Sequence, residues 1–146
     1  MVANAGRDPA ERARPLTGLR VLVVDDDQDV RDFLSIVLAD PGAAVRIAES
    51  VERALEPSRA ERMSVVVADL AMPGHDGFEL IHSLRDQPGA LGIPVIALTA
   101  LAGVEDRKRA ADAGFSHFLS KPVEEEQLVA TIRQAAELGR LARVGC

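Results

Sequence analysis

Two apolar runs of the chain end in acidic residues, which indicates where chemistry could occur. Three aspartates at positions 25–27 follow the run 19–24, and Asp69 follows the run 65–68. Successive carboxylates repel one another, so either some of them take up protons or a cation lies among them. Magnesium prefers hard oxygen ligands and is usually held by one or two carboxylates plus a phosphate oxygen. The pattern therefore favours a site for a metal ion and a phosphoryl group.

Each acid also has an ordinary structural explanation. Asp27 can cap a helix that begins near Gln28, and an aspartate after a strand, such as Asp69, is often only a turn residue. Taken alone, Asp25 and Asp26 fit a metal site and local structure equally well.

Two further runs end in residues that could contact phosphate oxygens. The run 93–98 is followed by Thr99, and the run 115–120 by Lys121 and Pro122. Alone, the threonine is more often a satisfied strand-end hydroxyl, and a Lys–Pro pair is more often a surface turn. If the four runs are neighbouring parallel strands, their ends form one site, because ligands bind at the carboxyl ends of such strands.

The apolar spacing predicts five strands, each followed by a helix. The expected strands are 19–24, 44–48, 65–68, 93–98 and 115–119. The first helix should bury Val30, Phe33, Leu34, Val37 and Leu38, Pro57 must kink or end the second, and Asp76 should cap the third. This alternation predicts an α/β fold with a parallel sheet covered by helices on both faces.

Composition limits the classes of function. The 146 residues fit one domain, and the formal charge of −6 argues against nucleic acid as the main partner. No apolar run approaches the roughly 18 residues that span a bilayer, and the one cysteine, Cys146, excludes an internal disulfide. We therefore expect a cytoplasmic protein with a flexible arm at 1–17, one domain at 18–140 and a short tail at 141–146.

The motifs in this order resemble the receiver domain of two-component response regulators. The resemblance extends from about residue 19 to 139 and rests on five features: the acidic run, Asp69 with Met72-Pro73-Gly74, Asp76-Gly77, Thr99-Ala100, and Lys121-Pro122. It implies a flavodoxin-like (βα)5 doubly wound sheet of strand order 2-1-3-4-5, which places the first and third strands side by side.

The resemblance also implies a role for each run end. Asp69 would accept a phosphoryl group from a phosphohistidine of a sensor histidine kinase or a histidine phosphotransfer protein. Asp26 would bind Mg²⁺ directly and Asp25 through water, with Asp69 and the backbone carbonyl of Ala71 as further ligands. Lys121 and Thr99 would contact the phosphoryl oxygens. Such a chain phosphorylates itself and can dephosphorylate itself, but it is not a conventional turnover enzyme.

Other expectations from the resemblance concern the protein's switching. The Lys121–Pro122 peptide should be cis. Phe118 stands where the family has an aromatic residue that moves inward with the threonine, although Phe118 could equally be a core residue. Ala71 and Leu101 occupy the two positions that set phosphoryl lifetime, and neither can orient a water, so hydrolysis should not be specially fast.

The partner surfaces are less specific. The basic residues 107–109 could meet a partner or a second copy through the fourth helix, fifth strand and fifth helix, or they could form an ordinary solvated face. Ile36 lies off the apolar stripe of the first helix and is a candidate kinase contact. The downstream partner is not indicated. We expect a stand-alone receiver rather than a piece excised from a hybrid kinase.

Two rival functions use the same residues differently. A haloacid dehalogenase-like phosphatase would use Asp25 and Asp27 after the first strand, but Asp29 then occupies the position where that family usually has Thr or Val, and Asp69 has no role. A binding module of the same fold, independent of phosphorylation, would leave the complete set of site residues unused.

Overall fold

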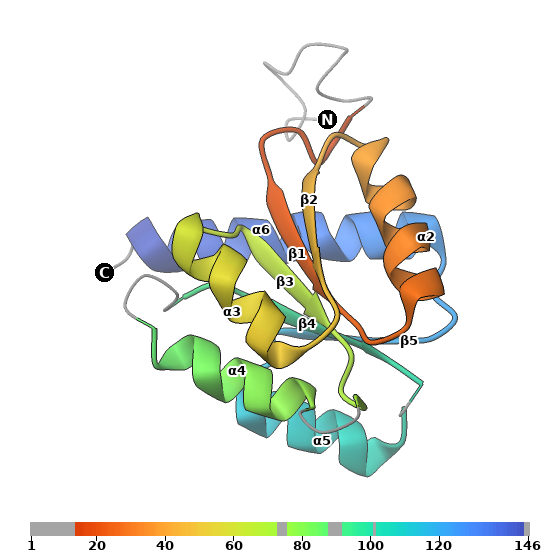
Figure 1. The fold of residues 1–146 in the computed structure, drawn as a ribbon, viewed down its shortest axis with the longest axis vertical. Helices are drawn as coiled ribbons and strands as arrows, with labels where there is room; N and C mark the ends of the chain where they lie inside the picture. The colour runs from red at the N-terminus through yellow and green to blue at the C-terminus, as the bar shows by residue number, and fades with distance from the viewer. Residues whose placement is uncertain (1–13, 73–75, 88–91, 101, 145–146) are drawn as a thin grey trace.

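The computed structural model describes residues 14–72, 76–87, 92–100 and 102–144, which build a five-stranded parallel sheet between two layers of helices (Figure 1). The strands are β1 (Arg20–Val24), β2 (Ala44–Ala48), β3 (Val65–Ala68), β4 (Val95–Thr99) and β5 (His117–Ser120). The helices are α2 (Gln28–Ala39), α3 (Val51–Ala60), α4 (Gly77–Arg85), α5 (Val104–Ala113) and α6 (Glu125–Val144). The strand order β2-β1-β3-β4-β5 confirms the predicted flavodoxin-like (βα)5 topology.

The register of the central strands brings their carboxyl ends to one edge of the sheet. Val24 pairs with Ala68 across β1 and β3, and Ala68 pairs with Ala97 across β3 and β4. The chain turns from β1 toward β2 on one side and reaches β3 on the other, so the strand order reverses between β1 and β3. The residues that follow these two strands therefore lie at the switch point where ligands bind in open α/β sheets.

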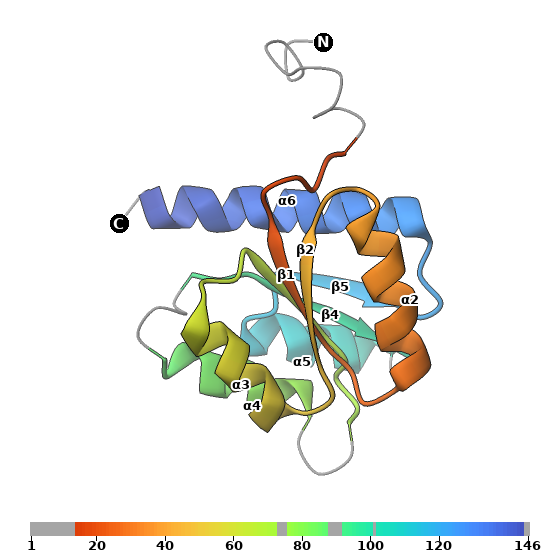
Figure 2. The ribbon, with the colours of Figure 1, turned by 45° about the horizontal axis from the view of Figure 1, so that its top comes forward.

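Two apolar clusters hold the helices against the sheet. One contains Leu22, Val66 and Ala97 and packs against α3, α4 and α5, while the other contains Val21, Val67 and Ile96 and packs against α2 and α6. Figure 2 shows α6 crossing one face of the sheet beside α2, with α3, α4 and α5 on the other. Successive side chains of a strand point to opposite faces, which explains why strands buried on both faces are apolar throughout.

Several boundaries differ from the prediction. Helix α3 does not end at Pro57 but continues to Ala60, where the amide of Glu61 still donates to the Pro57 carbonyl at 3.1 Å, and a kink at Pro57 stays a prediction. β4 begins at Val95, after Pro94, which has no amide hydrogen to give to a neighbouring strand. β5 begins only at His117, because the Phe115 amide instead closes the end of α5 by donating to Ala110.

The folded part is also longer than predicted at both ends. Leu16 is fully buried, and its amide donates to the Pro41 carbonyl at 2.9 Å, so the sheet's apolar cluster takes in part of the expected arm. Helix α6 continues to Val144, where a tail was expected from residue 141. The rest of the predicted arm and the last two residues lie outside the described part of the chain.

One predicted core residue lies at the surface. Helix α2 buries Leu34, Val37 and Leu38, but Phe33 is 50% exposed.

Within the described residues, no helix is both long enough and apolar enough to cross a membrane.

Candidate functional site at the carboxyl edge of the sheet

Three carboxylates meet where β1 and β3 end. Asp25 and Asp69 are buried, with 2% and 7% of their surface exposed, whereas Asp26 is exposed. Each of the three offers a carboxylate oxygen within 4.8 Å of the others. The predicted convergence of these acids is confirmed, because the parallel pairing of β1 and β3 places their last residues side by side.

Lys121 bridges the two buried carboxylates. Its Nζ donates to Asp25 Oδ2 at 2.8 Å and to Asp69 Oδ2 at 2.9 Å. The pairing of β4 with β5 places Lys121 there, because Thr99 lies in register with Ser120 and the Lys121 amide donates to the Thr99 carbonyl at 2.9 Å. The Lys121–Pro122 peptide is cis, as predicted.

The second oxygen of each buried carboxylate is held by the backbone. Asp25 Oδ1 accepts from the Asp27 amide at 3.0 Å, and Asp69 Oδ1 accepts from the Ala71 amide at 3.0 Å. Both side chains thus have a lysine on one oxygen and a backbone amide on the other. These contacts fix the direction in which each carboxylate points.

Burial and charge act in opposite directions on the ionisable groups. Burial raises the pKa of the Asp25 carboxyl, although hydrogen bonds from Lys121 and from the Asp27 amide partly offset the shift. Burial alone would lower the pKa of the Lys121 ammonium, but its bonds to Asp25 and Asp69 outweigh that effect, and the pKa is raised. Lys121 therefore remains a cation between two acids at neutral pH.

The remaining predicted residues lie around the group formed by Asp25, Asp69 and Lys121. Asp27 caps α2 by accepting from the Asp29 amide, and Asp76 caps α4 by accepting from the Glu79 amide. Thr99 is fully buried at the end of β4, next to the backbone of Lys121. Ala71 is exposed and presents its amide to Asp69.

Other predictions are untested. Phe118 is half-buried against the cluster under α4 and α5, which agrees with a core role and leaves its switching role a prediction. Leu101 and the loop residues 73–75 lie outside the described residues.

Sequence reasoning missed the role of two residues in positioning the site. The Arg31 guanidinium donates to the Asp25 carbonyl at 2.7 Å and so ties the first turn of α2 to the end of β1. At Gly77, a Cβ would lie 2.5 Å from the Asp69 carbonyl oxygen, so only glycine lets α4 begin this close to β3. The Asp76-Gly77 pair was a visible signal for the second residue, whereas an arginine in a helix gives none.

The carboxylates suit a hard divalent cation. Three oxygen donors that lie within 4.8 Å of one another can surround one small ion, and the exposed side of Asp26 leaves room for water ligands, which Mg²⁺ retains. These three aspartates are among the ligands that the sequence predicted, and the fourth, the backbone carbonyl of Ala71, stays a prediction. Lys121 also contacts Asp25 and Asp69, so a bound ion and the lysine would divide the oxygens of these two carboxylates.

Comparisons with known proteins agree with this geometry. The sequence model of the response regulator receiver domain matches residues 21–133. A 14.6 kDa protein of Leptolyngbya boryana described as uncharacterised is 44% identical over 119 residues, which cover 82% of this chain and 91% of that protein. The transcriptional regulatory protein TcrA of Mycobacterium tuberculosis is 32% identical over 140 residues, or 96% of this chain and 54% of TcrA.

Solved structures give the same result. The chemotaxis protein CheY4 of Vibrio cholerae superimposes with a TM-score of 0.77 at 30% identity, over 80% of this chain and 98% of CheY4. The chain thus spans nearly all of CheY4 and about half the length of several of its curated relatives, such as TcrA.

Proposed function

The chain belongs to the response regulator receiver domain family, and from this premise we propose that it is the phosphoacceptor of a two-component phosphorelay, with Asp69 as the acceptor. The observation that carries the proposal is the environment of Asp69. This carboxylate is buried at the switch point, beside two other acids that could share a cation and within 2.9 Å of the Lys121 ammonium. The rival phosphatase needs Asp27 as a second catalytic acid, but Asp27 is engaged in capping α2.

The reaction is an in-line displacement at phosphorus. A carboxylate oxygen of Asp69 forms a bond to the phosphorus atom as the bond from phosphorus to an imidazole nitrogen of the donor phosphohistidine breaks. The electron pair stays on that nitrogen, which takes up a proton, and the product is an aspartyl phosphate. The chain's part is to position the nucleophile and to stabilise charge, as in other phosphoryl transfers.

Asp25, Asp26, Asp69 and the backbone carbonyl of Ala71 would hold Mg²⁺. When bound, this ion offsets the negative charge that gathers as phosphoryl oxygens approach three carboxylates. Lys121 supplies a second positive charge by turning from the carboxylate oxygens to a phosphoryl oxygen. The buried Thr99 hydroxyl donates a hydrogen bond to another phosphoryl oxygen.

A phosphodonor protein would dock beside the site. A largely apolar groove of about 440 Å³ lies between α2 and the segment after β5, and its lining includes Val30, Phe33 and Pro122. Phe33 and Ile36 are 50% and 73% exposed on α2, which places two apolar contacts near the groove for a helix of a histidine kinase or phosphotransfer protein. We place this exchange in the cytoplasm, and its product is an altered partner-binding surface.

The proposal is tested by incubating the full chain with Mg²⁺ and acetyl phosphate and measuring its intact mass. We expect one added phosphoryl group in the native chain and in Asp86→Asn, an exposed aspartate remote from the site. Asp69→Asn should add none, and chelation of the metal should abolish uptake in the native chain and in Asp86→Asn. Uptake in Asp69→Asn, or continuous release of phosphate that depends on Asp25, would contradict the proposal.

A further inference from the structure

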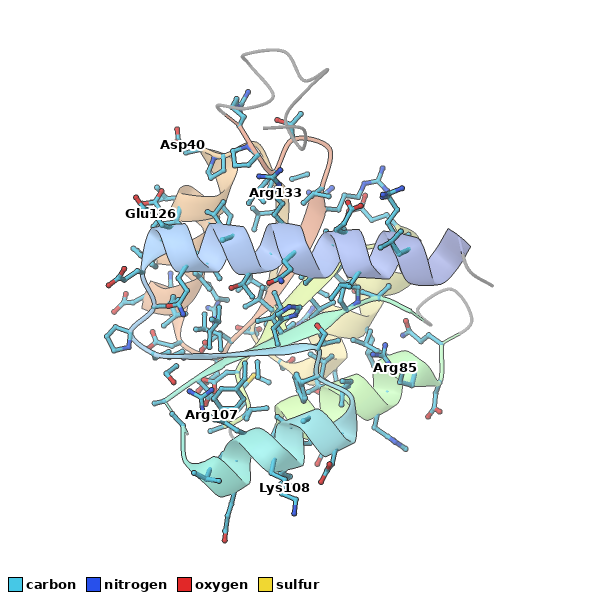
Figure 3. The ribbon with its side chains drawn as sticks, turned by 180° about the vertical axis from the view of Figure 1, so that it is seen from behind. Asp40, Arg85, Arg107, Lys108, Glu126 and Arg133 are labelled. Atoms are coloured by element: carbon cyan, nitrogen blue, oxygen red, sulfur yellow. The ribbon has the colours of Figure 1, made fainter. Side chains whose placement is uncertain are left out.

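The basic run on α5 divides into three different environments. The Arg107 guanidinium carbon lies 4.7 Å from the centre of the Phe118 ring on β5, and that of Arg109 lies 4.0 Å from the Phe78 ring on α4. Lys108 points away from the sheet, whereas Arg107 lies between α5 and β5 (Figure 3). The run is therefore not one uniform solvated face.

Arg107 makes a second contact closer to the site. Its Nη2 donates to the Ser120 hydroxyl at 3.3 Å, and Ser120 is the residue immediately before Lys121. Phe118 and Ser120 are two residues apart on β5, so their side chains leave the same face of the sheet. A single arginine thus contacts both residues on the α5 side of the strand that delivers Lys121.

The same face carries Thr99. On β4, Ala97 belongs to the cluster under α4 and α5 and Leu98 to the opposite cluster, so alternation directs the Thr99 side chain toward the α5 face. Thr99 also pairs in register with Ser120. Arg107 therefore bonds to the immediate neighbour of both residues proposed to contact the phosphoryl oxygens.

We propose that Arg107 is a positioning residue that holds Phe118 and the end of β5 in the arrangement in which Lys121 pairs with Asp25 and Asp69. This inference rests on the proposed phosphorylation of Asp69. Phosphorylation requires Lys121 to leave the carboxylate oxygens, and contacts that stabilise the earlier arrangement oppose that change. Arg107 thereby sets how readily the edge of the sheet rearranges.

The test compares initial rates of phosphorylation by acetyl phosphate with Mg²⁺ in the full chain. An exposed cation over an aromatic ring changes a two-state equilibrium by about two- to fivefold, so Arg107→Ala should be phosphorylated faster by up to that factor. Lys108→Ala removes the same charge from the next residue of α5 without touching Phe118, and its rate should equal that of the native chain. Arg107→Lys keeps the charge but not the planar fork and should give an intermediate rate.

A double-mutant cycle identifies the route. In a Phe118→Leu background, Arg107→Ala should change the rate by much less than it does in the native chain, because the ring contact is already absent. The Phe118 ring resonances in NMR spectra of the unphosphorylated chain should shift in Arg107→Ala and not in Lys108→Ala. A purely structural role would lower stability without changing the phosphorylation rate.

The outcomes separate this inference from the proposed function. Equal rates for the native chain and Arg107→Ala, or an undiminished effect in the Phe118→Leu background, would overturn the role of Arg107 alone. A native chain that takes up no phosphoryl group would overturn both, and the absence of uptake distinguishes that result from an unchanged rate.

Discussion

The last residue of β1 and the residue that follows it are both buried, but their burial has opposite effects on the stability of the fold. Val24 is fully buried in the apolar cluster, and Asp25 is buried to within 2% at the edge of the same sheet. The pattern repeats at β3, where buried Ala68 is followed by buried Asp69. Burial of the apolar side chains stabilises the fold, whereas burial of a carboxylate opposes its ionisation and must be offset by partners.

This difference separates stability from function within single strands. The interiors of β1, β3 and β4 hold the helices in place, and the residues at their ends are the polar and charged groups of the site. Lys121 and two backbone amides keep the buried acids in place. If this division is correct, removing an apolar side chain from a strand interior should lower stability, neutralising a buried acid at the edge should raise it, and changes in phosphorylation should not follow changes in stability.

The largest effect on stability is expected in the strand interior. Leu22 is fully buried on β1, and Leu22→Ala should lower the free energy of unfolding by about 2–5 kcal/mol, because it removes apolar contacts and leaves a cavity. Ile36→Ala, at a position 73% exposed, is the matched control and should change stability little. Urea unfolding measures both. The molecules of Leu22→Ala that remain folded should still accept a phosphoryl group from acetyl phosphate. A loss of that reaction would contradict the assignment of the strand interior to stability alone.

A smaller loss is expected when the lysine at the edge is removed. Lys121→Ala leaves Asp25 and Asp69 facing each other without their shared cation, and the stability should fall by about 1–3 kcal/mol at neutral pH. Because the pKa of Lys121 is raised in the fold, its contribution is complete below the pKa of the unfolded lysine and is lost as the pH rises through the folded pKa. The difference between the two free energies of unfolding should therefore stay constant from neutral pH to about pH 10 and shrink only above it, as the pH rises through the raised pKa of folded Lys121. A gap that stays constant into that range would show that Lys121 acts through packing rather than charge.

The sequence was sufficient to predict the charged ends of the strands. Each expected strand at the site is a short, mostly apolar run that ends in a polar residue, and the strand order implied by the receiver resemblance placed Asp25, Asp69, Thr99 and Lys121 at one edge. The sequence was also sufficient to predict hydrogen bonds between a side chain and nearby backbone, as in the helix caps made by Asp27 and Asp76.

Contacts between residues far apart in the sequence could not be predicted in this way. Nothing in the sequence distinguishes three arginines from ordinary surface cations. The structure shows that Arg31 bonds to the Asp25 carbonyl, whereas Arg107 and Arg109 lie over two different aromatic rings. Phe33 fitted the apolar stripe of α2 but faces outward, because helical spacing gives the width of a stripe only approximately. The buried Leu16 bonds to a loop 25 residues away, which spacing cannot reveal.

The smallest expected effect is a gain in stability, whereas substitution of a buried residue usually lowers stability. Asp25→Asn keeps the shape of a buried side chain and an oxygen for the Asp27 amide, but it removes the charge whose burial raises the pKa of Asp25. A raised carboxyl pKa means that the folded chain holds its proton more tightly than the unfolded chain, so the native protein loses stability as the pH rises from the unfolded pKa to the folded pKa. Asp25→Asn escapes this loss and should be more stable than the native chain by about 1 kcal/mol at neutral pH, measured by urea unfolding with EDTA present.

The gain in stability should disappear under acidic conditions, where Asp25 is protonated. The same variant should be phosphorylated more slowly with Mg²⁺, because a proposed metal ligand is gone. An Asp25→Asn chain that is less stable at neutral pH would show that the bond to Lys121 outweighs the burial of the charge, and the edge of the sheet would then stabilise the fold as its interior does.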